Sequence, residues 1–154
     1  MIKTKPSRRK YRSFHEPLEH RQLLAANPII TEFTASNNDL LTDGYGENSD
    51  WIEIFNAGDL ALDIGGWYLT DDASDLTKWT FPTANLAAGE YLVVFASGRG
   101  SVDPTGKLHT NFRLRSQGEQ LALVRPDGAT VVSSFGDFDI NYPAQFADVS
   151  YGVV

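Results

Sequence analysis

The stretch SDWIEIFNAGDLALDIGGWYLTDD, Ser49–Asp72, carries the strongest structural signal in this chain. Its two apolar runs, Trp51–Phe55 and Trp67–Thr70, are bounded by Asn-Ala-Gly-Asp and Gly-Gly. Aromatic and β-branched residues favour strands, whereas glycine, asparagine and aspartate favour tight turns. The stretch therefore predicts two packed strands, with a shorter extended segment at Leu60–Ile64 between them.

The same strand and turn chemistry continues on both sides of this stretch. Pro126-Asp127-Gly128 separates two alternating runs and is typical of a hairpin turn. No window has a sustained 3.6-residue apolar period, and connections this short favour antiparallel pairing. We therefore predict an all-β, antiparallel β-sandwich of seven to eight strands. Besides those in the opening stretch, the expected runs are Ile29–Thr34, Lys78–Phe81, Glu90–Ala96, Phe112–Leu114, Glu119–Val124 and Thr130–Phe135.

The apolar positions of these runs predict the core. Sandwiches of this size usually bury their tryptophans between the two sheets. The predicted core residues are Trp51, Ile54, Trp67, Leu69, Trp79, Phe81, Leu92, Val94, Leu121 and Leu123. The alternative is a sugar-stacking platform formed by Trp51, Trp67, Tyr68, Trp79 and Tyr91, which we consider less favoured than core packing.

Charge is divided unevenly along the 154 residues, which carry a net charge of −7. Residues 1–21 hold seven Lys or Arg and two Glu, whereas the remainder holds six basic and eighteen acidic residues. Affinity for phosphates comes mainly from clustered Lys and Arg, so the acidic part is not expected to bind nucleic acid. The absence of cysteine excludes disulfides, a thiol nucleophile and cysteine-based zinc sites.

Three segments are expected along the chain. Residues 1–26 form a basic N-terminal segment that is disordered or serves in targeting, since residues 1–13 lack hydrophobic periodicity and small apolar residues follow them. Residues 27–137 form the sandwich. Residues 138–154 form a linker or an extra strand. The longest apolar run, Tyr91–Ala96, is far too short to span a bilayer, which needs about 20 residues.

A catalytic triad would require His109 to meet Ser97 or Ser101 and an aspartate such as Asp103. The sequence around these serines does not resemble a nucleophile elbow. We therefore predict no catalytic residues, and interpret His109 as a polar residue at the start of a strand.

Two acidic loops could hold a hard cation: Asp43, Glu47 and Asp50 in one, and Asp71, Asp72 and Asp75 in the other. Ca²⁺ takes six to eight oxygen ligands, which such loops can supply, so Ca²⁺ is the one cofactor we consider. Aspartates also bond turn backbones directly, and that interpretation is favoured, with no metal site expected.

Glu53 is unusual because it lies within a strong strand and shares a face with Trp51 and Phe55. Either that face is partly solvated, or the carboxylate accepts backbone N–H groups from a loop. We expect Asp50, Glu53, Asp71 and Asp72 to be the residues that meet a partner.

An ordered series of motifs resembles the lamin-tail domain, most closely in its bacterial branch. The resemblance covers about residues 27–136. It implies an immunoglobulin-like β-sandwich without known catalytic residues. In bacteria such domains are appended to surface proteins, secreted nucleases and other hydrolases, which implies a tethering or recognition module. The motifs are ITEF at Ile30–Phe33, SDWIEIFN at Ser49–Asn56, LDIGGWYLTD at Leu62–Asp71, WTFP at Trp79–Pro82, and the runs Leu86–Phe95 and Gly118–Asp127.

The segment Glu16–Ala25, EPLEHRQLLA, is similar to a LEPR-xLL-type motif that opens large bacterial surface proteins. It departs from the motif because Leu18 follows Pro17 and Glu19-His20-Arg21 precede Gln22. The similarity implies an exported protein, extracellular or at the cell surface. Tyr142–Gly152 resembles the linker that leads to a further module, so we expect a chain truncated before that module.

These features predict a non-enzymatic binding or structural module that serves adhesion, scaffolding or tethering. The expected partners are a protein or polysaccharide at the cell surface and other modules of a larger protein. Two alternatives stay open. One is a Ca²⁺-assisted carbohydrate-binding module, and the other is an accessory domain of a hydrolase whose catalytic module lies outside this chain.

Overall fold

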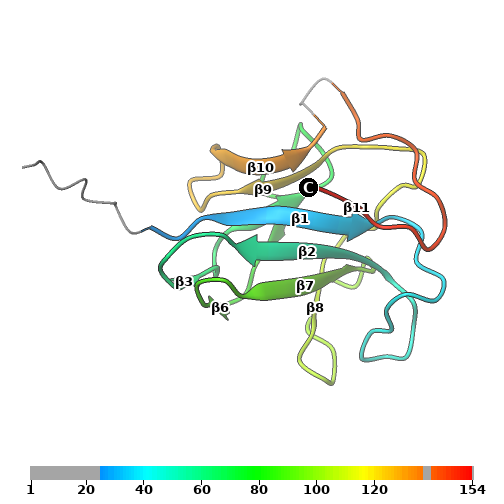
Figure 1. Ribbon diagram of the computed structural model, residues 1–154, viewed down its shortest axis with the longest axis horizontal. Coiled ribbons are helices and arrows are strands. Elements are labelled where there is room, and N and C mark those ends of the chain that lie inside the picture. The colour runs from blue at the N-terminus through cyan, green and yellow to red at the C-terminus, as the bar shows by residue number, and fades with distance from the viewer. Residues whose placement is uncertain (1–24, 137–139, 154) are drawn as a thin grey trace, which may run out of the picture.

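The computed structural model describes residues 25–136 and 140–153, which form a β-sandwich (Figure 1). The predicted tail, residues 1–26, therefore lies almost wholly outside the described residues. None of the described segments is a helix long and apolar enough to cross a membrane. The strands are β1 (Pro28–Thr34), β2 (Asp50–Asn56), β3 (Leu62–Asp63), β4 (Tyr68–Thr70), β5 (Trp79–Thr80), β6 (Asn85–Leu86), β7 (Tyr91–Ala96), β8 (Leu108–His109), β9 (Leu121–Val124), β10 (Val131–Phe135) and β11 (Tyr151–Gly152).

Two sheets form the layers of the sandwich. One has the order β11-β1-β2-β7-β8 and the other β10-β9-β4-β5, while β3 and β6 form a separate short pair. The predicted antiparallel pairing is wrong at one place, because β7 and β8 are parallel. The long loop between them lets the chain return to the same end of the sheet, which a tight turn cannot do.

β1 and β2 are slightly longer than their predicted runs, whereas most later runs become shorter strands, and the described residues hold eleven strands instead of seven or eight. The extra ones, β6, β8 and β11, contain two residues each and depend on partners distant in sequence. Phe112–Leu114 forms no strand, although Arg113 makes an isolated bridge with Ser97. The hairpin between β9 and β10 is confirmed, with Gly128 at a positive φ of 67°.

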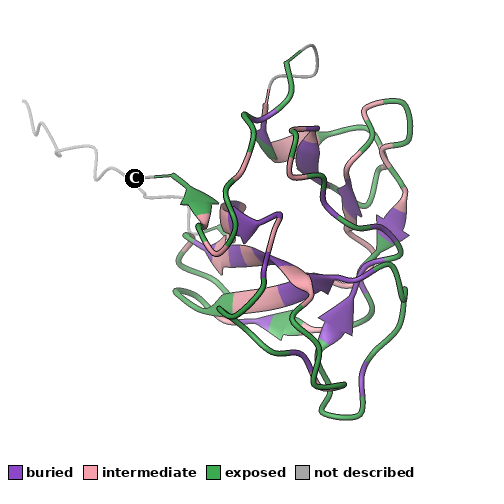
Figure 2. Cartoon of the chain, turned by 90° about the vertical axis from the view of Figure 1, so that its right-hand side faces the viewer, coloured by how far each residue is buried: buried purple, intermediate pink, exposed green. Residues whose placement is uncertain are grey.

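The core lies between the two sheets, and the connecting loops carry most of the exposed residues (Figure 2). Three aromatic rings from distant segments meet there: Phe33 lies 5.1 Å from Phe135 and 4.6 Å from Tyr142 between ring centroids. Of the predicted core residues, Trp67 and Leu92 are partly buried and pack against this cluster. Those buried within it are Ile54, Leu69, Trp79, Phe81, Val94, Leu121 and Leu123.

Trp51 is the exception among the predicted core residues. It is buried, but it lies outside the core cluster, which takes Ile52 and Ile54 from the same strand. Successive side chains of a strand point to opposite faces, so Trp51 cannot share the core side with Ile52. The aromatic residues of the alternative sugar platform come from both sheets, and of the strand residues among them only Tyr91 is exposed.

Segment 138–154 lies against the sandwich in its described part. Tyr142 is 2% exposed within the core, and β11 pairs with the edge of β1. The Tyr142 hydroxyl donates to the carbonyl of Arg115 at 3.0 Å. The sequence predicted either a linker or an extra strand for residues 138–154, and residues 151–152 form a strand.

We predict that Leu69→Ala lowers the free energy of unfolding by about 2–5 kcal/mol, because it removes a fully buried side chain and leaves a cavity. Leu60→Ala is the matched control, since Leu60 is 46% exposed, and its effect is expected to stay within about 0.5 kcal/mol. Urea denaturation of both variants measures the difference. Equal costs for the two substitutions would contradict the assigned core.

Candidate functional site

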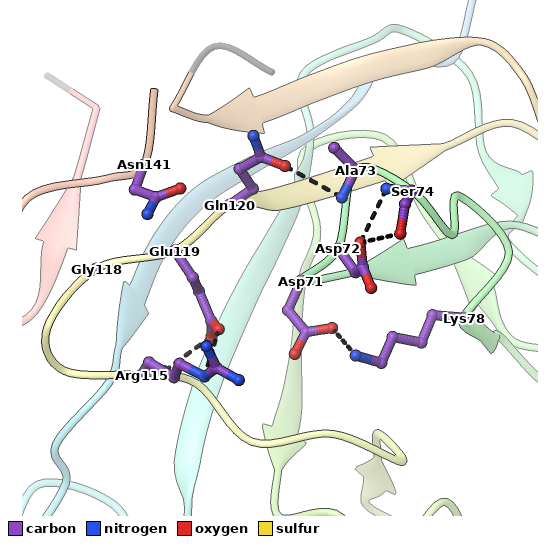
Figure 3. A pocket seen from close by; sticks show the side chains of 10 residues that line it. All are labelled: Asp71, Asp72, Ala73, Ser74, Lys78, Arg115, Gly118, Glu119, Gln120 and Asn141. Atoms are coloured by element: carbon purple, nitrogen blue, oxygen red, sulfur yellow. Dashed lines mark hydrogen bonds and ion pairs between the residues drawn. The ribbon is translucent and has the colours of Figure 1, made fainter. Parts of the chain in front are cut away.

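A polar cavity of about 490 Å³ lies where β4 ends and β9 begins (Figure 3). We call it the acidic cavity, because three carboxylates and two cations surround it. Two of the predicted binding residues, Asp71 and Asp72, belong to it. Its lining is Asp71, Asp72, Ala73, Ser74, Lys78, Arg115, Gly118, Glu119, Gln120 and Asn141.

Asp71 is held by Lys78 at the side of the cavity. The Asp71 Oδ1 and Lys78 Nζ atoms are 2.5 Å apart, and the Asp71 side chain is only 10% exposed. Within the described chain Oδ1 has no hydrogen bond besides this ion pair. A buried carboxylate requires a compensating partner, and the ammonium group of Lys78 supplies one for Asp71.

Glu119 supplies the second buried carboxylate. Its Oε1 accepts hydrogen bonds from the amide of Arg115 at 2.8 Å and from the Tyr142 hydroxyl at 3.3 Å. Burial raises the pKa of Glu119, and the negative charge of Asp71 raises it further against the hydrogen bonds. Gly118 is required beside it, because its φ is 105° and a Cβ there would overlap the carbonyl oxygen of Tyr142.

In the acidic turn after β4, the carboxylates of Asp72 and Asp75 accept hydrogen bonds from residues of the same turn. Asp72 accepts from the amide and hydroxyl of Ser74 at 2.8 and 2.6 Å, and these bonds lower the pKa of Asp72. Asp75 accepts from Thr77 in the same way. Among the described residues no group of three or more acidic, His or Cys side chains is arranged to hold a metal ion.

The other two predicted binding residues lie apart from this cavity. Asp50 lines a smaller hollow of about 230 Å³ with Ser97 and Arg113, and accepts from the amide of Asn37 at 3.2 Å. Burial raises the pKa of Asp50 to about 6, although hydrogen bonds and Arg113 act against it. Glu53 is half-buried on the opposite face of its sheet from the core, where it accepts from the Thr31 hydroxyl.

In the first acidic loop, the carboxylates of Asp43 and Glu47 are also engaged by neighbouring protein groups. Asp43 accepts from the amides of Tyr45 and Glu47 and from the hydroxyl of Ser49. Burial raises the pKa of Asp43, but these hydrogen bonds outweigh it and the net shift is downward. Glu47 forms an ion pair with Arg99 at 2.8 Å. The Asp43 carboxylate therefore serves to hold the turn that contains it.

The structure brings together the three residues that a catalytic triad would need. His109 Nδ1 lies 2.8 Å from Ser97 Oγ, and His109 Nε2 lies 3.2 Å from Asp103 Oδ2. The sequence predicted His109 to be a polar residue at the start of a strand; it does lie in a strand, but as the last residue of β8, and it is completely buried. The contact arises because the parallel β7–β8 pair places the two strands side by side.

The array has the composition of a triad, but its members are used to hold loops. Asp103 also accepts from the amides of Gly44, Thr105 and Lys107 at 2.7–3.0 Å. Burial raises the pKa of Asp103, but these bonds and His109 outweigh it, and the pKa falls well below its usual range. The array therefore joins the loop after β7 to the loop that contains Gly44.

Sequence reasoning missed Lys78, Arg115 and Glu119. Lys78 belongs to a predicted strand, and nothing local indicates that it turns toward Asp71. Arg115 and Glu119 contact each other across a turn that contains Gly118, and the Tyr142 hydroxyl from a distant segment bonds both of them. The tight turn at Gly118 was the one available signal.

The fold defines a small immunoglobulin-like β-sandwich domain, with loops held by aspartate side chains. Comparison with protein-family profiles matches residues 25–138 to the Lamin Tail Domain. The chain belongs to the lamin tail domain family, whose members are immunoglobulin-like domains. A comparison with curated proteins finds no match.

Asp50 predicts a pH dependence of stability. Its pKa is about 6 in the folded state and 3.8 ordinarily, so the folded state binds more protons between these values. Its stabilising contribution is present below pH 4 and is lost as the pH rises through 6. The free energy of unfolding of Asp50→Asn, measured relative to that of the wild type, is therefore expected to rise by on the order of 1 kcal/mol from pH 4 to pH 7. This figure allows for the partial exposure of Asp50.

Urea denaturation at the two pH values measures this difference. Asp59→Asn is the matched control, because it removes one exposed carboxylate. Its difference from the wild type should stay within about 0.5 kcal/mol at both pH values. If the free energy of unfolding of Asp50→Asn differed from that of the wild type by the same amount at both pH values, the pKa of Asp50 would not be raised by folding.

Proposed function

We propose that this chain is a non-enzymatic binding and structural module of an exported, bacterial cell-surface protein, where it serves adhesion, scaffolding or tethering. Its partner is a protein or polysaccharide of the cell surface, and the acidic cavity is where that partner binds. Membership of the lamin tail domain family supports the general role of a binding or structural domain. The basic composition of residues 1–21 and the motif-like segment at Glu16–Ala25 support the proposed export.

The observation that carries the non-enzymatic role is the burial of the Ser97–His109–Asp103 array. Ser97 and Asp103 are each 5% exposed and His109 is completely buried. A nucleophile must reach the reacting carbon at about 3 Å, and a serine that is only 5% exposed presents very little surface to a substrate. The Ser97 hydroxyl also accepts from the amide of Arg99 at 3.3 Å.

The acidic cavity suits a polar ligand better than an apolar one. It offers the carboxylates of Asp71 and Glu119, the cations of Lys78 and Arg115, and the amide of Asn141 (Figure 3). Because the cations donate hydrogen bonds and the carboxylates accept them, the cavity can bond sugar hydroxyls or a polar protein loop. Asp72, which could assist a Ca²⁺ ion, is already engaged by Ser74, so we place the Ca²⁺-assisted module second.

We predict that the purified chain does not turn over ester, phosphate-ester, nucleic-acid or glycoside substrates, and that a fluorophosphonate probe does not label Ser97. Ser97→Ala should instead lower the free energy of unfolding by about 1–2 kcal/mol, because His109 Nδ1 loses its buried partner. Turnover or labelling that disappears in Ser97→Ala would contradict the non-enzymatic role.

We further predict that the chain co-sediments with cell envelopes of its own host. Ser74→Trp places a bulky ring at the exposed rim of the acidic cavity and is expected to weaken this binding at least fivefold. Leu60→Trp adds the same ring at an exposed position outside the cavity lining and should leave binding unchanged. Failure of the wild type to sediment would overturn the surface role, and equal loss in both variants would overturn the cavity as the site.

A further inference from the structure

The sheet that contains β1, β2 and β7 has a second face, turned away from the core. Ile30, Ile54 and Val94 are buried on the core side. By the two-residue alternation of strands, their neighbours point to the opposite side. We call this side the outer sheet face and define it by Ile29, Thr31, Glu53, Phe55, Tyr91 and Val93, all of them intermediate or exposed.

An aromatic pair stands on this face. Phe55 and Tyr91 are cross-strand partners, and their rings are stacked with centroids 4.5 Å apart and an angle of 28° between planes. Tyr91 is nevertheless 57% exposed. Phe55 therefore holds one side of the Tyr91 ring, and the ring presents an ordered aromatic surface to a partner.

Two carboxylates gather beside the aromatic pair because β1 contains a bulge. The register slips between Ile30 and Glu32, so Thr31 and Glu32 together oppose Glu53. Thr31 Oγ1 donates to Glu53 Oε1 at 2.6 Å, and the Ser150 hydroxyl donates to Glu32. A hollow of about 400 Å³ lies here, lined by Thr31, Glu32, Glu53, Tyr91, Gly152 and Val153.

Hydrogen bonds hold Glu32 and Glu53 in place, but neither forms an ion pair among the described residues. Within residues 25–136 and 140–153, the lysines and arginines that form ion pairs do so with Asp71, Glu47 and Glu119, and none reaches Glu32 or Glu53. Like charges directly opposite each other across strands are destabilising. A cation between Glu32 and Glu53 would remove that repulsion.

The chemistry that fits this face is a positive charge on an aliphatic stem. The cation would meet the carboxylates of Glu32 and Glu53, and the stem or guanidinium plane would lie on the Tyr91 ring. Lysine and arginine side chains have this shape, whereas a neutral sugar would leave the paired charges uncompensated. The extended, half-apolar face around the hollow gives room for neighbouring residues of the same segment.

We propose that the outer sheet face is a docking surface for a basic segment of a partner protein, with a lysine or arginine side chain between Glu32, Glu53 and Tyr91. The surface shares no residue with the acidic cavity. The proposal therefore stands or falls independently of the binding assigned to that cavity.

The test is a titration of the ¹⁵N-labelled full chain with the peptide (Arg-Ala)₆, followed by amide chemical shifts. The largest shifts are expected at Thr31, Glu53 and Tyr91. Glu53→Gln and Tyr91→Ala should each raise the dissociation constant at least fivefold. Cellohexaose and the acidic peptide (Glu-Ala)₆ are titrated in parallel, and neither should shift these amides.

Matched controls separate a docking surface from general attraction to an acidic protein. Asp59→Asn removes one exposed negative charge, as Glu53→Gln does, and Phe146→Ala removes an aromatic side chain that is 77% exposed. Both should change the dissociation constant less than twofold. The proposal is overturned if the shifts map to Asp71 and Glu119, if the controls weaken binding equally, or if only cellohexaose binds. Unchanged spectra elsewhere in each variant establish that it is folded.

Discussion

Strand β2 divides its side chains between two faces, and the rest of the molecule depends on that division. Ile52 and Ile54 enter the core, where the opposing sheet covers them. Glu53 and Phe55 are thereby directed to the outer sheet face, and the paired strands β1 and β7 must follow the same alternation. A slip of one residue would exchange the two sets, so core packing and surface chemistry are specified together.

Aspartate side chains give the loops their shape. Asp43, Asp72, Asp103 and Asp127 each accept bonds from the backbone of the turn that contains them. Their pKa values are lowered in the folded state, so each favours folding only while it is ionised. Much of the acidity of this domain is therefore turn chemistry, and only the remaining carboxylates are available to a partner.

Local patterns in the sequence predicted the long strands, the hairpin at Gly128 and most of the core, because alternation and turn residues are local properties. They did not predict β8 or the parallel pair, since those depend on where a long loop returns. The contact of His109 with Ser97 has the same origin. The bulge at Thr31 is a mismatch between two strands, which neither strand shows alone. The acidic cavity likewise combines segments distant in sequence, since the Tyr142 hydroxyl bonds both Arg115 and Glu119.

Tyr142 and β11 also have a consequence for the order of folding. Phe33, near the start of the described chain, packs against Tyr142, and β11 closes onto β1 across more than a hundred residues. A core completed by contacts this distant in sequence cannot close before Tyr142 and β11 have been synthesised, and sandwiches dominated by such contacts fold slowly, in milliseconds to seconds. The sandwich thus remains open at the edge of β1 until the segment from Tyr142 to β11 is available to pack against it.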